Sequence, residues 1–111
     1  ASVDVTDSEK FRHSLETLDS ALGGANFFIA NAGIGDVSRP KSDDWERTKR
    51  TLSVNVLAAF DGLEFMKAKM VARGYGTLCG VSSVAGTRGL PDSGAYCASK
   101  AALTTFLESL R

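Results

Sequence analysis

The apolar residues near the start of the chain fall at helical spacing. Four of them step by four, three and four residues: Phe11, Leu15, Leu18 and Leu22. This stripe predicts one buried helix face. Thr6 and Glu9 have the spacing of a capping box, so we expect the helix to begin there and to end at Gly23-Gly24. The preceding Val3-Asp4-Val5 is a short β-prone run.

The longest apolar stripe predicts a helix of about seven turns. Its members step by three or four residues: Trp45, Thr48, Leu52, Val56, Ala59, Leu63, Met66 and Met70. We expect Ser42 to cap its start, where acidic residues suit the helix dipole, and Gly74 and Gly76 to end it. Asn55 fits the pattern poorly, because a better helix former would cost less there.

Two runs of strand length separate the helices. Asn26–Ala30 is apolar without alternation, which is typical of a strand buried on both faces of a parallel sheet. Thr77–Val81 is the second run, and a third helix starts near Ala95 and continues to Arg111. The order strand, helix, strand, helix, strand, helix predicts an α/β fold with parallel strands and helices on both faces.

Composition restricts the class of protein. The chain has 111 residues, 43% of them hydrophobic, which suits one packed domain and is too short for two. Thirteen basic residues balance thirteen acidic ones, so we expect no nucleic-acid partner and no anionic membrane surface. No apolar stretch approaches the ~20 residues that span a bilayer. Cys79 and Cys97 lack metal-ligand spacing and indicate buried thiols in a reducing, cytoplasmic compartment, with no metal site.

Candidate chemistry follows the carboxyl ends of the strands, where α/β sheets bind ligands. Tyr96 and Lys100 are four residues apart on a helix, so they lie on one face. A nearby ammonium favours the phenolate form of a tyrosine, which can then exchange protons. Ser83 follows the strand end, where its hydroxyl could hold a carbonyl or alcohol oxygen. These groups suit proton transfer coupled to hydride transfer, and the hydride must come from a cofactor.

Four motifs together resemble those of the short-chain dehydrogenase/reductase family, in its single-domain branch. They are Ala30-Asn31-Ala32-Gly33, Val54-Asn55-Val56, Val81-Ser82-Ser83-Val84-Ala85-Gly86 and Tyr96-Cys97-Ala98-Ser99-Lys100. Ser83 precedes Tyr96 by 13 residues, the spacing common in that branch. The resemblance runs from Val3 to the last residue and implies a Rossmann-type parallel sheet with flanking helices.

The resemblance implies a role for each matching catalytic position. Tyr96 is expected to be the catalytic acid/base, and Lys100 to favour its ionised form and to bond the nicotinamide ribose. Ser83 is expected to hold the substrate oxygen. Asn55 is similar to the family asparagine that supports a water-mediated proton relay at a helix kink.

The resemblance also implies a cofactor, NAD or NADP, and a small-molecule alcohol or carbonyl substrate. Asp4 and Val5 match the pair beside the adenine. Asn31, Ala32 and Gly33 match the turn along the ribose, where glycine lets the backbone approach closely. The residues that choose between NAD and NADP precede Ala1 in the family pattern, so both stay open. Dimers or tetramers of the intact protein, formed through the long central helix, are expected by analogy.

Two departures from the family pattern temper these expectations. Ala30 replaces an asparagine, at a position that varies. More seriously, the family's glycine-rich pyrophosphate turn does not occur, so we expect residues 1–111 to be the central portion of one such domain, without that turn or the C-terminal substrate segment. The two strands would then present open edges.

Two alternatives to an active dehydrogenase stay open. The first is a non-catalytic truncated fragment that cannot bind the cofactor alone. The second is an epimerase or dehydratase acting on nucleotide sugars, although the Ser-to-Tyr spacing favours the single-domain dehydrogenases.

Overall fold

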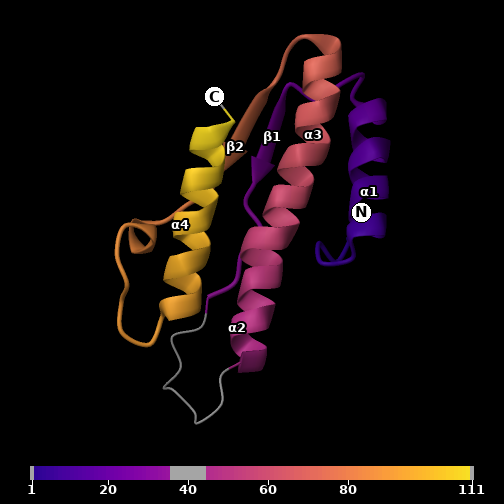
Figure 1. Cartoon of the computed structure of the whole chain (residues 1–111). Helices are drawn as coiled ribbons and strands as arrows, with labels where there is room; N and C mark the ends of the chain where they lie inside the picture. Colours follow the sequence, from indigo (N-terminus) through magenta and orange to yellow (C-terminus); the bar gives the residue numbers. More distant parts are fainter. Residues whose placement is uncertain (1, 36–44, 111) are drawn as a thin grey trace.

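The computed structural model describes residues 2–35 and 45–110 and has a two-stranded parallel sheet flanked by helices (Figure 1). Phe28 pairs with Leu78 and Ala30 pairs with Gly80. In chain order the elements are α1 (Ser8–Ala21), β1 (Phe27–Ala30), α2 (Trp45–Leu52), the π-helix η1 (Ser53–Ala58), α3 (Ala59–Arg73), β2 (Thr77–Gly80), the 3-10 turn η2 (Val84–Gly86) and α4 (Gly94–Ser109). The predicted α/β class and the parallel pairing of the two strands are confirmed.

The first helix is capped by a different residue from the one predicted. The Asp7 side chain accepts from the backbone N–H of Lys10, so Asp7 is the N-cap of α1. Thr6 instead gives its amide and its hydroxyl to Asp4 Oδ1, at 2.9 and 2.8 Å. Those bonds hold residues 4–7 as a turn, so the capping box at Thr6 and the strand at Val3–Val5 were wrong.

The long helix is interrupted where Asn55 fitted the apolar pattern poorly. Residues Ser53–Ala58 form a π-helix, whose wider turn holds one residue more than an α-helical turn. The buried positions at the end of α2 and within η1 lie one residue earlier than the predicted stripe, at Thr51, Asn55 and Ala58. The predicted stripe is correct from Leu63 onward and wrong in its first half, and Trp45 is 60% exposed. The predicted cap, Ser42, lies outside the described residues.

The helices pack against one face of the sheet. The core cluster joins Leu15, Met66 and Met70 to the sheet residues Phe28 and Leu78. Glycine permits these close approaches. A Cβ on Gly62 of α3 would lie 2.8 Å from Phe28 Cζ, and one on Gly80 would lie 2.6 Å from Leu107 Cδ1 of α4.

The other face of the sheet is open in the part of the chain that the structure describes. Phe27 and Ile29 are 66% and 57% exposed. Their side chains alternate with those of Phe28 and Ala30, so they point away from the helices. The prediction that β1 is buried on both faces was therefore wrong for these residues, and so was the prediction of helices on both faces.

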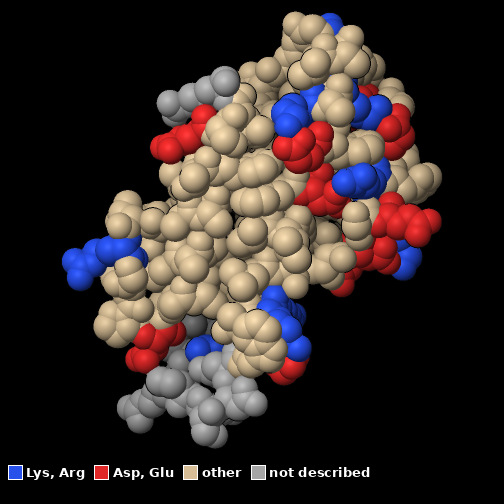
Figure 2. Space-filling model, viewed as in Figure 1, with Lys and Arg blue, Asp and Glu red and all other residues tan. Residues whose placement is uncertain are grey.

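A buried ion pair ties α1 to α3 at the end of the sheet where the strands begin. The Asp19 carboxylate accepts from Ala25 N at 2.7 Å and from the Arg73 guanidinium at 2.9 and 3.0 Å. The bond from the Ala25 amide, followed by the charge of Arg73, holds the pKa of Asp19 below its usual range. Figure 2 shows oppositely charged side chains interspersed on the side formed by α1 and α3, whereas the centre of this view is largely uncharged.

Candidate active site

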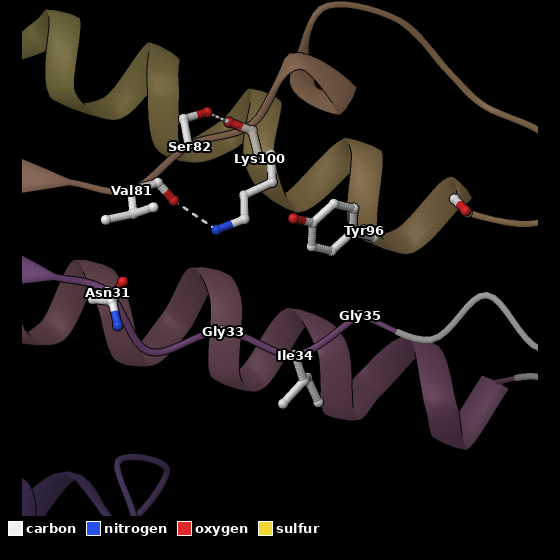
Figure 3. Close-up of a pocket in the computed structure, with 9 residues that line it drawn as sticks. Asn31, Gly33, Ile34, Gly35, Val81, Ser82, Tyr96 and Lys100 are labelled. Carbon is white, nitrogen blue, oxygen red and sulfur yellow. Dashed lines mark hydrogen bonds between the residues drawn. The ribbon is translucent and has the colours of Figure 1, made fainter.

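A cleft of about 430 Å³ lies beyond the carboxyl ends of both strands, where parallel α/β sheets bind ligands. Three segments line it: the turn that follows β1, the chain after β2, and the start of α4 (Figure 3). The lining residues are Asn31, Gly33, Ile34, Gly35, Val81, Ser82, Ser93, Tyr96 and Lys100. The structure therefore brings together four of the predicted residues, Asn31, Gly33, Tyr96 and Lys100.

Lys100 is a buried cation held at the end of β2. The residue is only 5% exposed, and its Nζ donates to the carbonyl of Val81 at 2.6 Å. The same Nζ lies 5.7 Å from the centre of the Tyr96 ring. Figure 3 shows the phenol oxygen and the ammonium directed into the space between α4 and the turn after β1. The two polar groups therefore face the same part of the cleft.

Two glycines let the turn after β1 pass close to these groups. A Cβ on Gly33 would lie 3.5 Å from both Lys100 Nζ and Asn55 Oδ1. A Cβ on Gly35 would lie 3.0 Å from Tyr96 Cδ2, closer than a side chain tolerates without movement of the ring. Because both positions lack a side chain, the backbone of the turn lies close to the ammonium and the phenol without displacing them.

Asn55 lies behind the cleft and fixes the turn. It is 1% exposed, in the π-helix. Its Oδ1 accepts from Ile34 N at 2.8 Å, and its Nδ2 donates to Ile34 O at 2.8 Å and to Ser99 Oγ at 3.0 Å. Ile34 was missed from the sequence, although its position between Gly33 and Gly35 could have pointed to a backbone contact.

The two serines after β2 have different surroundings. Ser82 lines the cleft, and its hydroxyl bonds to Lys100 O at 3.1 Å and to Thr104 Oγ1 at 2.7 Å. Ser83 precedes η2, and its hydroxyl accepts from Ala85 N at 3.1 Å. Ser83 is not among the residues that line the cleft, so its part in holding a substrate oxygen stays a prediction.

Of the remaining predicted cofactor residues, Val5 and Ala32 lie along a second hollow and Asp4 does not. Val5, Asn31 and Ala32 help to line a space of about 120 Å³, and Asn31 borders both this space and the cleft. Asp4 lines neither. It accepts from the amide and the hydroxyl of Thr6, and these bonds hold the pKa of Asp4 below its usual range.

Two absences hold for residues 2–35 and 45–110. No three His, Cys, Asp or Glu side chains lie close enough together to hold a metal ion. None of the helices there has the length and apolar content that crossing a membrane requires.

Known proteins match the sequence over its whole length. A family model described as short chain dehydrogenase matches residues 1–111. A protein of Myxococcus xanthus described as an uncharacterized oxidoreductase is 43% identical over 109 residues, which cover 98% of this chain and 43% of that protein. An uncharacterized oxidoreductase of Mycobacterium tuberculosis is 38% identical, and the match covers all of this chain and 44% of the relative. The chain thus spans less than half the length of these curated relatives.

Solved structures match the arrangement of the elements. The crystal structure of an NAD⁺-bound xylitol dehydrogenase superposes with a TM-score of 0.89 at 29% identity, over 96% of this chain and 42% of that one. An NADPH-dependent 3-quinuclidinone reductase from Rhodotorula rubra superposes with a TM-score of 0.87 at 30% identity, over 96% of this chain and 41% of that one. These matches assign the two-stranded sheet and its helices to a Rossmann-type fold.

Proposed function

Because the chain belongs to the short-chain dehydrogenase family, we propose that it supplies the acid/base side of a hydride-transfer site acting on an alcohol/carbonyl pair. Its relatives are described as oxidoreductases, which supports a dehydrogenase or reductase role. The observation that carries the finer proposal is the shared cleft. It places the Tyr96 phenol and the Lys100 ammonium beside a turn that has no side chains at Gly33 and Gly35.

The residues around the cleft fit a nicotinamide cofactor. A flat, polar ring system needs backbone that it can approach closely, and Gly33 and Gly35 leave such a surface uncovered. Asn31 continues this surface toward the second hollow, where Val5 and Ala32 lie, so an elongated ligand could extend along it. When bound, the cofactor accepts or supplies the hydride. We propose NAD or NADP as this cofactor, since the xylitol dehydrogenase is described as NAD⁺-bound and the quinuclidinone reductase as NADPH-dependent.

The chain's own groups handle the proton. In alcohol oxidation, the Tyr96 phenolate takes the hydroxyl proton while the hydrogen on the carbon leaves with its electron pair as hydride, which forms the carbonyl. Lys100 stabilises the phenolate by its charge and is held for this by the Val81 carbonyl. Ser83 would hold the substrate oxygen with its hydroxyl hydrogen, which the bond accepted from the Ala85 amide leaves free. Asn55 supports the proton path from the π-helix.

Replacement of Tyr96 by phenylalanine tests this assignment. In the whole protein that carries this sequence, Tyr96→Phe should abolish nearly all cofactor-dependent interconversion of alcohols and carbonyls, because only the proton-exchanging oxygen is lost. Formation of reduced nicotinamide over an alcohol panel measures it. Tyr75→Phe is the matched control, since Tyr75 is exposed and does not line the cleft. Undiminished turnover in Tyr96→Phe would contradict the assignment.

The open face of the sheet favours a second candidate, in which the 111-residue chain by itself is not catalytic. Phe27 and Ile29 are exposed there. This supports the second candidate, in which the 111-residue chain does not bind the cofactor alone. Calorimetric titration of the chain with NAD⁺ and with NADP⁺ separates the two candidates, because tight binding of either one refutes the non-catalytic reading.

A further inference from the structure

Ser99 is a fully buried hydroxyl without a part in the chemistry proposed above. It is 0% exposed, precedes Lys100 in α4 and does not line the cleft. Its Oγ accepts from Asn55 Nδ2 at 3.0 Å and donates to the carbonyl of Tyr96 at 2.7 Å. It therefore lies between a buried side chain of the π-helix and the backbone of the residue that carries the phenol.

The directions of these bonds follow from the chemistry of the partners. The amide nitrogen of Asn55 only donates, so Ser99 Oγ accepts from it and has its own hydrogen free for the Tyr96 carbonyl. The Asn55 Oδ1 accepts from the Ile34 amide, which fixes which atom of the side chain is nitrogen. An exchange of the two would set two donors against each other at Ile34. One arrangement of donors and acceptors thus satisfies the Ile34 amide, the Asn55 side chain, the Ser99 hydroxyl and the Tyr96 carbonyl together.

These bonds join three segments that are far apart in the sequence. Ile34 belongs to the turn after β1, Asn55 to η1, and Ser99 and Tyr96 to the first turns of α4. The separation between the turn and α4 matters, because the built Cβ of Gly35 already lies 3.0 Å from the Tyr96 ring. A change of a few tenths of an ångström there alters where the phenol oxygen lies in the cleft.

We propose that Ser99 is a positioning residue: its hydroxyl connects Asn55 to the Tyr96 backbone and so sets the phenol and the ammonium at a fixed distance from the turn after β1. The proposal rests on the proposed function, since it assigns Ser99 a part in placing that function's acid/base pair. Without the hydroxyl, Asn55 still holds Ile34, but its hydrogen bond to α4 is lost.

A pair of isosteric variants separates the hydroxyl from its volume. Ser99→Thr and Ser99→Val add the same bulk to a closed site, and only threonine can form both hydrogen bonds. We expect Ser99→Val to lower kcat roughly tenfold or more, with a smaller change in KM, because misplacement of a reacting group acts on the chemical step. Ser99→Thr should recover most of that loss. Ser109→Ala should leave both constants unchanged, because Ser109 bonds only to a carbonyl of its own helix, that of Phe106.

A second measurement does not depend on turnover. Exchange of the Asn55 side-chain amide protons with solvent, followed by NMR, should be slow in the wild type and in Ser99→Thr, and faster in Ser99→Val. A wild-type protein without hydride transfer would overturn the proposed function itself. An active wild type with equal kcat in the Thr and Val variants, or with equal amide exchange in both, would overturn the positioning role alone.

Discussion

The substitution Asn55→Asp changes one NH₂ group to an oxygen and tests the hydrogen-bond assignment at the centre of the site. The wild-type Nδ2 donates to Ile34 O at 2.8 Å and to Ser99 Oγ at 3.0 Å. A carboxylate of the same shape keeps the bond from Ile34 N but sets an acceptor against the Ile34 carbonyl. Ser99 can turn its hydrogen toward the carboxylate only by giving up its bond to Tyr96.

The size of the effect follows from the count of unsatisfied groups. A buried acceptor left without a donor costs about 1–3 kcal/mol, and both the Ile34 carbonyl and either the new carboxylate or the Tyr96 carbonyl are affected. We expect a loss of about 3 kcal/mol in the free energy of unfolding. With a urea slope of about 1–2 kcal/mol per M, the midpoint moves down by roughly 1.5–3 M at constant slope.

The loss of unfolding free energy in Asn55→Asp should depend on pH in a definite direction. Burial, together with the facing carbonyl of Ile34, should raise the pKa of the introduced carboxyl. The folded state then binds a proton more tightly than the unfolded state does. The deficit relative to the wild type is therefore smallest below about pH 4 and grows as the pH rises through the raised value.

Asn26→Asp is the matched control for Asn55→Asp, because it makes the same atomic change at an exposed residue. We expect it to shift the free energy of unfolding by no more than about 0.5 kcal/mol. Equal urea midpoints for the two variants, or a deficit at Asn55 that shrinks as the pH rises, would refute the assigned bonds.

Two further predictions concern stability. Gly62→Ala should destabilise the protein by about 1–3 kcal/mol in urea unfolding, because the new Cβ would lie 2.8 Å from Phe28 Cζ; an increase in stability from the better helix propensity would contradict this packing. Because the amide of Ala25 and the charge of Arg73 lower the pKa of Asp19, its contribution is present above its unfolded value of about 3.9 and is lost as the pH falls toward the folded value. Asp19→Asn should therefore flatten the acid limb of the stability curve, and an unchanged limb would exclude the bonded carboxylate as its source.

Local pattern was sufficient for the helices and for β1 and β2, and insufficient for the strand expected at Val3–Val5 and for the phase of the long helix. The spacing of Leu63, Met66 and Met70 predicted the buried face of α3 correctly. At the end of α2 and within η1, the same spacing selected Leu52 and Val56 instead of the neighbouring Thr51 and Asn55. A period of 3.6 residues cannot anticipate a turn with an extra residue, because that turn is stabilised by side-chain bonds to other segments.

The sequence predicted those parts of the candidate site that are formed by distinctive side chains. It did not predict the parts that are formed by backbone groups. Tyr96 and Lys100 share the cleft, as their spacing on a helix implied. The carbonyl of Val81 and the amide of Ile34 were not foreseen, since every residue has such groups and only the fold selects among them. Ser99 belongs to one of the four motifs, but its bond to Asn55 depends on a partner 44 residues away, which sequence spacing does not reveal.

Because of the π-helix, the number of residues in the long helix determines how its two halves are rotated relative to each other. An α-helix turns about 100° per residue, so the extra residue within Ser53–Ala58 rotates the segment that meets α4 relative to the segment that meets α1 and the sheet. Deleting one codon there would give a helix with more regular hydrogen bonds and would turn Asn55 away from Ile34. Selection on such a helix acts on residue number as well as on residue identity, and gaps in aligned relatives should avoid this turn.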